Sequence, residues 1–112
     1  MQSDDEMLMA RLAAGEANAL DVLFRRHHAR VYALCSRLAD RSSADDLVQE
    51  TFLRVLRFAR GFKAQSSFTT WLYRIARNVC VDERKAELRR NRQVIEIDVT
   101  AEADPRIHLL ER

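Results

Sequence analysis

The chain has 112 residues, of which 47% are hydrophobic and 32% charged, and its formal net charge is +2. This length fits one domain, this composition excludes a chain disordered throughout, and no apolar run approaches the roughly 20 residues of a membrane-spanning helix. The charge is uneven, because residues 25–93 carry an excess of basic groups whereas residues 1–24 and 94–112 carry an excess of acidic groups.

Two helices are predicted in the N-terminal part of the chain. Ser3 and Glu6 have the spacing of a capping box, and Gly15 ends the helix that follows. From residue 17 to residue 39, apolar side chains recur with a 3.6-residue period, which predicts a second, longer helix. The apolar stripe of this second helix consists of Leu20, Leu23, Phe24, Val31, Leu34, Cys35 and Leu38.

Two further helices are predicted in the basic middle of the chain. Ser43 is the expected N-cap of a helix over residues 44–60, because two aspartates follow it in the first turn, where the helix dipole favours them. Gly61 ends that helix, and either Ser66 or Ser67 caps a fourth helix over residues 68–90. We therefore expect an all-α fold, with a compact four-helix domain over residues 1–93.

The segment 94–112 has a different pattern. Ile95, Ile97 and Val99 alternate with polar residues, which predicts a strand-like or extended chain rather than a helix. Asp104 and Pro105 then have the character of an N-cap and the first position of another helix. We interpret this segment as an extended acidic C-terminal tail: a linker followed by the start of a second domain that the sequence does not contain.

No pattern of residues indicates an enzyme. Cys35 and Cys80 each lie in an apolar helical pattern without a second cysteine nearby, so we expect two buried, reduced thiols rather than a zinc or redox site. His27 lies on an apolar stripe and is expected to be a core histidine with a hydrogen-bond partner. Neither a catalytic triad, a metal-ligand spacing nor a phosphate-binding loop is visible, and no cofactor is expected.

One face of the predicted helix over residues 44–60 is polar and acidic. At 100° per residue, Asp46, Gln49, Glu50 and Leu53 share this face, opposite a core stripe of Val48, Phe52, Val55 and Ala59. An exposed leucine beside carboxylates fits a protein interface with a basic partner, although single surface leucines are also normal.

The loop 61–67 and the start of the next helix form a second candidate surface. Around Arg74, the helix places Thr70, Arg77, Asn78 and Lys85 on one face, with Phe68, Leu72, Ile75 and Val79 on the core side. Trp71 lies at the border, where it either packs entirely in the core or presents part of its ring to a ligand. Cations that bind phosphates, an amide that reads base edges and an aromatic ring for stacking indicate a nucleic-acid strand. An ordinary solvated basic surface is the alternative.

At these residues the chain resembles a known family. The segments DDLVQETFLRVLR and SFTTWLYRIARN, some 25 residues apart, closely resemble the second conserved region of bacterial sigma factors, in particular the extracytoplasmic function (ECF) group. The resemblance covers about residues 19–90. It implies a small helical domain that binds core RNA polymerase and recognises and helps melt the −10 promoter element during transcription initiation.

The resemblance also implies partners and contact residues. The first segment is expected to dock on a coiled coil of the largest polymerase subunit, through Asp46, Gln49, Glu50, Leu53 and Leu56. The loop and the second segment are expected to capture an extruded base of the non-template strand. The residues predicted to bind DNA are Lys63, Ser66, Ser67, Phe68, Thr70, Trp71, Arg74, Arg77, Asn78 and Lys85.

Further expectations concern the rest of the protein. Residues 94–112 resemble the family's acidic linker and the opening of its −35-binding domain, and an anti-sigma protein is a plausible partner. The acidic N-terminus lacks the basic start of a signal peptide, so a cytoplasmic location is expected. The alternative function is a helical adaptor or regulator that uses the same faces for protein interactions without binding nucleic acid.

Overall fold

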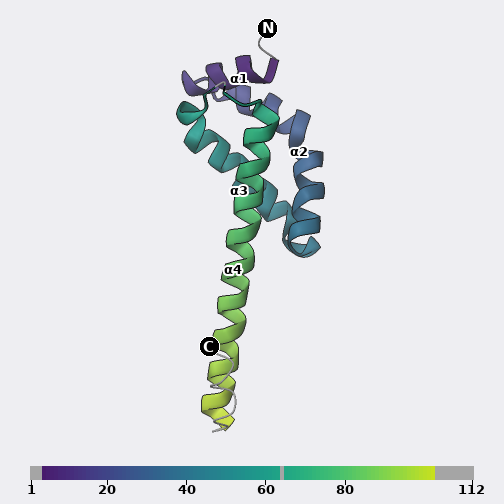
Figure 1. Ribbon diagram of the computed structural model, residues 1–112, viewed down its shortest axis with the longest axis vertical. Helices are drawn as coiled ribbons and strands as arrows, with labels where there is room; N and C mark the ends of the chain where they lie inside the picture. The colour runs from purple at the N-terminus through teal and green to yellow at the C-terminus, as the bar shows by residue number, and fades with distance from the viewer. Residues whose placement is uncertain (1–3, 64, 103–112) are drawn as a thin grey trace. The chain divides into compact units, whose positions relative to one another are not determined.

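The structure is a computed structural model that describes residues 4–63 and 65–102, with side chains described as far as residue 93. It divides into two compact units, residues 1–81 and residues 82–112. The first unit contains α1 (Asp4–Ala13), α2 (Asn18–Leu38), α3 (Ala44–Phe58) and the first turns of α4 (Phe68–Glu102), as Figure 1 shows. Two short 3-10 turns, η1 (Arg41–Ser43) and η2 (Ala59–Gly61), precede and follow α3. The described residues contain no strand, and the all-α prediction is confirmed.

The helix starts agree with the sequence, but the cap of α3 differs, α3 ends at Phe58 and passes into η2, and α4 extends beyond the predicted residue 90 to Glu102. Gly15 adopts a φ of 101°, a left-handed conformation that glycine reaches without steric cost, and it follows the end of α1 as predicted. Ser67 caps α4, because its Oγ accepts a hydrogen bond from the Thr70 N–H at 3.2 Å. The predicted cap at Ser43 is wrong: its side chain makes no capping hydrogen bond. The η1 turn directly precedes α3, so the capping residue is Asp40 at the start of that turn. The Asp40 side chain accepts a hydrogen bond from the Ser42 N–H at 3.5 Å.

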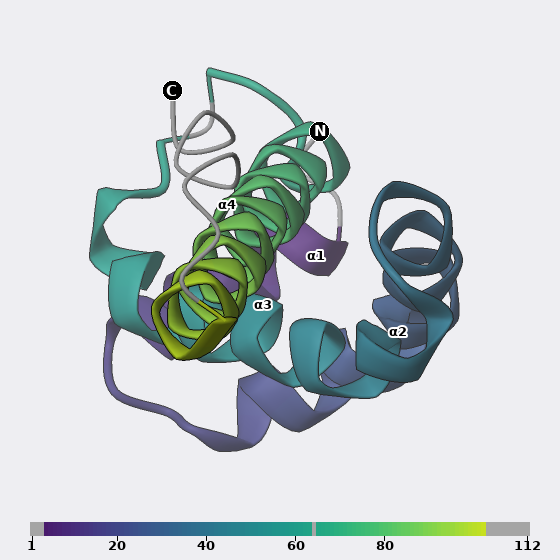
Figure 2. The ribbon, with the colours of Figure 1, turned by 90° about the horizontal axis from the view of Figure 1, so that it is seen from below.

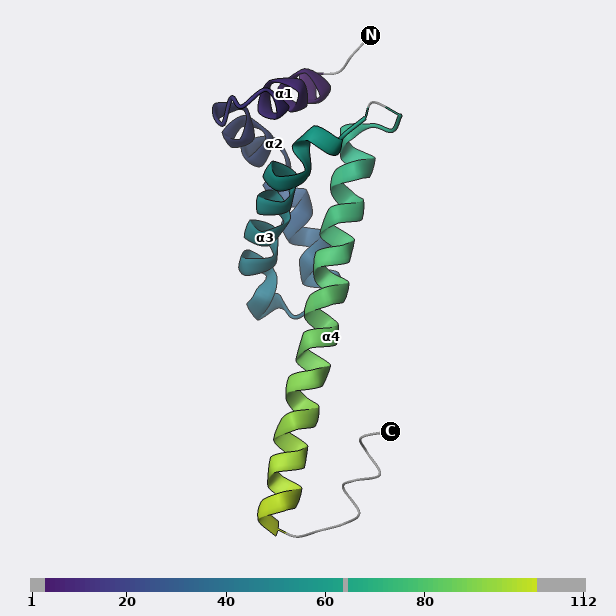
Figure 3. The ribbon, with the colours of Figure 1, turned by 90° about the vertical axis from the view of Figure 1, so that its left-hand side faces the viewer.

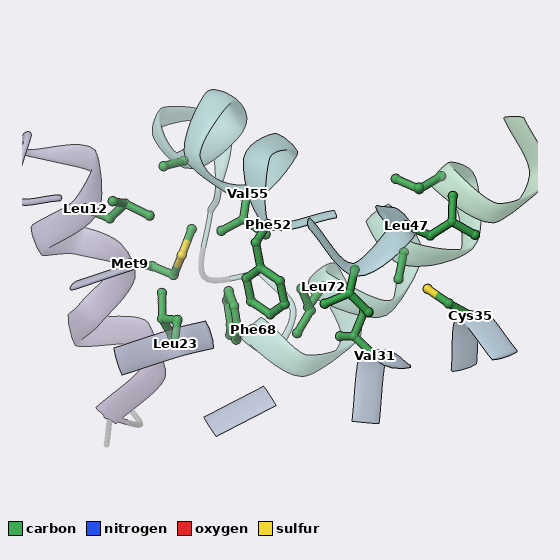
Figure 4. Packing of buried hydrophobic residues seen from close by; sticks show 14 of the residues in the cluster. Met9, Leu12, Leu23, Val31, Cys35, Leu47, Phe52, Val55, Phe68 and Leu72 are labelled. Atoms are coloured by element: carbon green, nitrogen blue, oxygen red, sulfur yellow. The ribbon is translucent and has the colours of Figure 1, made fainter. Parts of the chain in front are cut away.

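The core of the first unit is assembled from all four helices. α2 contacts both α1 and α3, and α1 also contacts η2. Met9 from α1, Leu23 from α2, Phe52 from α3 and Phe68 from α4 are at most 4% exposed, and Figure 4 shows their side chains in one continuous cluster. These side chains come from four separate segments, so the core joins all four helices within this unit.

His27 and Cys35 are buried along the same side of α2. His27 is 6% exposed, and its Nε2 donates to Asp5 Oδ2 of α1 at 3.0 Å, so the predicted core histidine with a partner is confirmed. Cys35 and Cys80 are both buried and unbonded, as predicted. Burial raises the pKa of the Cys35 thiol from 9.0 to about 12, and the adjacent Cys80 thiol, which is hydrogen-bonded to it, acts in the same direction. The hydrogen bond between the two thiols is therefore a contact between α2 and α4.

The second unit contains the rest of α4. Its side chains are mostly exposed as far as residue 93, and Arg90 pairs with Glu83 at 2.9 Å. The helix continues to Glu102, so the extended chain predicted from residue 94 is corrected over 94–102. An alternating pattern favours a strand only where a partner strand is available, and a helix already begun elongates easily because no glycine or proline interrupts it here. The predicted cap at Ser3 and the predicted helix after Pro105 lie outside the described residues.

Candidate nucleic-acid and protein interfaces

The loop 61–67 and the start of α4 enclose a surface pocket. Its volume is about 380 Å³, and it is lined by Gly61, Lys63, Gln65, Ser66, Trp71 and Arg74. Figures 1 and 3 show the loop at the beginning of α4, so the pocket is formed where the polar loop meets the first two turns of the helix. The structure therefore brings together four residues that the sequence assigned to DNA binding, namely Lys63, Ser66, Trp71 and Arg74.

The Trp71 ring, which lines this pocket, belongs to a cluster of aromatic rings. The Trp71 ring contacts Phe62, with 5.0 Å between the ring centroids, and lies 6.1 Å from the Phe68 ring. Phe68 in turn lies 5.2 Å from the His27 ring. Trp71 is only partly buried, because one side of its ring packs on this cluster while another lines the pocket. The alternative in which Trp71 packs entirely in the core is therefore wrong, and the binding of a ligand by the rest of the ring stays a prediction.

Phe68 is buried, as the helical period predicted, although the family resemblance included it among the DNA-binding residues. It is 1% exposed and packs among core side chains, so its ring offers no face to a ligand. In this structure the Phe68 ring packs beside Trp71, with 6.1 Å between the ring centroids, and does not line the pocket. Phe68 directly follows the Ser67 cap and begins the buried stripe of α4 that continues with Leu72 and Val79.

The remaining predicted residues of α4 are exposed. Arg74, Arg77 and Asn78 all point to solvent in the first unit, and none of them forms an ion pair among the described residues. Thr70 is also exposed, and its hydroxyl lies 2.9 Å from that of Ser67. Lys85 is exposed in the second unit. The α4 face thus presents two unneutralised guanidinium groups and a carboxamide beside the pocket.

The acidic face of α3 is also exposed as predicted. Asp46 and Gln49 lie on the surface, and Leu53 and Leu56 are 49% and 44% exposed. Glu50 is partly buried and its Oε1 lies 3.3 Å from Arg54 Nε one helical turn later. Because this pair is accessible to water, it adds little stability and leaves the carboxylate available to a basic partner.

The α3 face continues onto α2, which sequence reasoning did not predict. Asp46 and Gln49 line a second pocket of about 540 Å³ together with Phe24, His28 and Tyr32 of α2. Phe24 and His28 stack with their centroids 5.1 Å apart, and Phe24 meets Phe52 edge-on at 5.0 Å. Phe24 was assigned to the core stripe but is 39% exposed, because it forms the border between the core and this pocket.

The described part of the chain was searched for metal-binding groups and for membrane-spanning helices. Among those residues no group of three or more His, Cys, Asp or Glu side chains could hold a metal ion. Within the same residues, no helix combines the length and apolarity needed to span a membrane.

Comparisons with known proteins identify relatives. Residues 23–92 match the family model described as Sigma-70 region 2. The chain is 36% identical over 89 residues to the ECF RNA polymerase sigma-E factor of Haemophilus influenzae, covering 80% of this chain and 47% of that protein. It is 42% identical over 83 residues to the ECF RNA polymerase sigma factor SigM of Mycobacterium tuberculosis, covering 72% and 41%. The chain thus spans about half the length of the curated relatives that it matches.

Two solved structures have a similar fold. An engineered region 2 of sigmaE in complex with GTAAAA superposes with a TM-score of 0.74 at 34% sequence identity, covering 79% of this chain and 93% of that one. CnrH in complex with the cytosolic domain of CnrY superposes with a TM-score of 0.62 at 29% identity, covering 79% and 62%.

Proposed function

The chain belongs to the sigma-70 region 2 family, with ECF sigma factors among its relatives, and on this premise we propose that it binds core RNA polymerase and recognises and helps melt the −10 promoter element. One observation carries the proposal. The pocket between the loop and α4 combines Lys63, Trp71 and Arg74, and a structurally similar region 2 is in complex with the oligonucleotide GTAAAA. In this function the protein is a binding module and not an enzyme.

The proposed chemistry is the capture of an extruded base. Moving a base out of the duplex costs a few kcal/mol, and stacking it on an aromatic ring returns about 1–3 kcal/mol. Trp71 supplies the ring, and Ser66 and Gln65 supply polar groups within the same pocket. Arg74 and Arg77 bind the neighbouring phosphates, while Asn78 has an amide of the kind that reads base edges.

Titration with a single-stranded GTAAAA oligonucleotide tests this assignment. Trp71 is the single tryptophan of the chain, so its fluorescence reports directly on the pocket. Replacing Arg74 and Asn78 by alanine is expected to weaken binding about tenfold, since a lost base contact alone is worth about 1–3 kcal/mol. The matched control replaces Asn18 and Arg25, which are exposed on α2 and away from the pocket, and is expected to bind normally.

Two results of this titration would count against the proposal. Unchanged affinity in the Arg74 and Asn78 variant would remove the α4 face from the DNA-binding surface. If the unaltered protein bound no oligonucleotide at either low or high salt, the adaptor function, which uses the same faces for proteins alone, would replace the proposed one. DNA binding through phosphates must weaken as salt rises.

We propose that polymerase docks on the α3 face. Asp46 and Glu50 supply negative charge, and Leu53 and Leu56 supply exposed apolar surface, which together match a basic partner with an apolar centre. Reversing both carboxylates, by Asp46→Lys and Glu50→Lys, is expected to abolish binding to a fragment that holds the coiled coil of the largest polymerase subunit. Reversal of Asp21 and Glu87, which are exposed elsewhere, serves as the control. Retained binding in the first variant would refute the docking face.

Three further parts of the proposal concern the protein around this domain. We take residues 1–93 as the region 2 domain and residues 94–112 as an acidic linker that leads toward a −35-binding domain. We also propose that the protein works in the cytoplasm, where polymerase and promoter DNA are found. An anti-sigma protein that covers the two interfaces is a plausible regulator, since the similar CnrH is found in complex with the cytosolic domain of CnrY.

A further inference from the structure

Asp5 of α1 contacts His27 of α2, and neither residue lines the pocket that contains Trp71 (the Trp71 pocket) or the pocket between α2 and α3. The Oδ2 atom of Asp5 lies 3.0 Å from Nε2 of His27, and its Oδ1 atom accepts a hydrogen bond from Arg26 at 3.3 Å. The Asp5 side chain is 20% exposed and the His27 side chain 8% exposed, so water has little access to the contact between them. Because water hardly competes there, the hydrogen bond to the carboxylate is stronger than the same bond on the surface.

This contact decides which nitrogen of the neutral His27 ring carries the hydrogen. A carboxylate only accepts hydrogen bonds, so Nε2 is the donor and carries it. The other nitrogen, Nδ1, is buried and has no hydrogen-bond partner among the described residues. Within that part of the chain, Asp5 is therefore the single polar anchor of the ring. Without Asp5, neither tautomer would gain a hydrogen bond, and no polar contact would fix the χ2 angle of the ring.

The His27 ring connects this contact to the aromatic cluster around Trp71. Its centroid lies 5.2 Å from that of the Phe68 ring, at an interplanar angle of 58°, and the Phe68 centroid lies 6.1 Å from that of Trp71. Phe62 completes the cluster, with its centroid 6.2 Å from Phe68 and 5.0 Å from Trp71. Figure 2 shows α2 and the loop 61–67 on different sides of α4, and His27 is not one of the residues that line the Trp71 pocket. Any effect of His27 on that pocket is therefore indirect.

The packing of these rings depends on the orientation of His27. Aromatic rings prefer edge-to-face or offset contacts, because their edges are positive and their faces negative. When an imidazole ring turns over about χ2, nitrogen and C–H exchange places at its edges, so the edge that meets Phe68 changes. Phe68 is 1% exposed and closely packed, so it passes a displacement on to its neighbours. Trp71 is only partly buried and is the neighbour with room to move.

We propose that Asp5 is a positioning residue of the Trp71 pocket. By accepting the hydrogen bond from His27 Nε2, Asp5 holds the His27 ring in one orientation, and this ring in turn sets the positions of Phe68 and Trp71. The inference rests on the proposed function, in which the Trp71 ring stacks on the captured base. It adds to that function a residue of α1, a helix that carries none of the residues predicted to bind DNA.

Three single substitutions in the full chain test the proposal. Asp5→Ala removes the acceptor of the hydrogen bond. Asp5→Asn keeps a carbonyl oxygen that accepts the same hydrogen bond. Arg26→Ala is the matched control, because it removes the exposed ion pair with Asp5 and leaves the contact between Asp5 and His27 in place. Circular dichroism and urea unfolding verify that each variant is folded under the conditions of the other measurements.

Asp5→Ala is expected to change three measured properties. The emission maximum of Trp71, the single tryptophan of the chain, shifts because its aromatic neighbours move. The affinity for single-stranded GTAAAA falls about threefold, which is part of what a stacked base contributes. In nitrogen NMR spectra at alkaline pH, where imidazoles are neutral, the His27 signals move from the Nε2–H tautomer toward a mixture of both tautomers. Asp5→Asn is expected to restore most of each property, and Arg26→Ala to leave all three unchanged.

Three results would overturn the proposal. Unchanged emission and affinity in a folded Asp5→Ala variant would show that the contact with His27 does not position Trp71. Equal changes in Asp5→Ala and Arg26→Ala would assign the effect to the ion pair between α1 and α2, and equal changes in Asp5→Ala and Asp5→Asn would assign it to the charge of Asp5. If the unaltered protein failed to bind GTAAAA, the proposed function itself would fail, whereas the Trp71 emission of the same variants would still decide whether Asp5 positions the ring.

Discussion

Phe68 offers the sharpest test of how the base pocket is built. Its ring is 1% exposed and lies beside Trp71, Phe62 and His27, at 6.1, 6.2 and 5.2 Å between centroids. Phe68→Leu keeps an apolar side chain there but removes the aromatic contacts. Volume-conserving core substitutions cost less than about 1.5 kcal/mol and each lost aromatic pair roughly 0.5–1.5 kcal/mol. With each of the three pairs near its lower limit, we expect the free energy of unfolding to fall by about 2 kcal/mol.

This loss has a thermal and a functional consequence. A unit of about 80 residues has a stability of roughly 4–12 kcal/mol, so the variant stays folded, with Tm lowered by roughly 10 °C. Since Trp71 loses one of its two aromatic neighbours, we expect its emission maximum to shift. The affinity for single-stranded GTAAAA is expected to fall about fivefold, which is part of the 1–3 kcal/mol that a stacked base contributes. Urea unfolding and fluorescence titration measure both quantities on one sample.

A matched control separates support from direct contact. Phe52→Leu makes the same chemical change at a residue that is 4% exposed and packs edge-on against Phe24, away from the loop. It is expected to lower the free energy of unfolding by less, because one aromatic pair is lost instead of three, and to leave both DNA affinity and Trp71 emission unchanged. If Phe68→Leu abolished DNA binding without altering stability or emission, Phe68 would contact DNA directly, and its role as the support of Trp71 would be refuted.

Three further predictions follow from individual contacts. Ser67→Ala removes the cap of α4 and is expected to lower the free energy of unfolding by about 1 kcal/mol in urea titrations, and an unchanged midpoint would show that the cap contributes nothing. The raised pKa of Cys35 means that the unfolded thiol ionises first, so stability is complete below pH 9 and declines toward pH 12. We expect a loss of about 1 kcal/mol between pH 9 and pH 10 that is absent from Cys35→Ala, and equal slopes in the two proteins would contradict it. Deleting residues 94–112, whose net charge is −3, is expected to tighten DNA binding, because it removes net negative charge that repels phosphates, and unchanged affinity would contradict this expectation.

The sequence by itself determined the helices and the faces within each helix. The period of apolar residues and the positions of Gly15, Gly61 and Ser67 are local signals, because the 3.6-residue repeat decides which side chains share a face. The exposure of Asp46, Leu53, Arg74 and Asn78 was predictable for the same reason. Local signals failed where two local structures compete, as at Ser43, where a 3-10 turn takes over the start of the helix, and over residues 94–102, where helix continues despite an alternating pattern.

Only the tertiary structure decided which faces meet. Cys35 and Cys80 are 45 positions apart in the sequence, and packing of α2 against α4 makes their thiols neighbours. The same packing gathers Arg37 and Arg77 around one pocket and brings the buried Phe68 ring beside His27 of α2. Contacts of this kind depend on how segments distant in the chain bury their apolar stripes together, and helical periodicity, which relates only residues a few positions apart, carries no information about that choice.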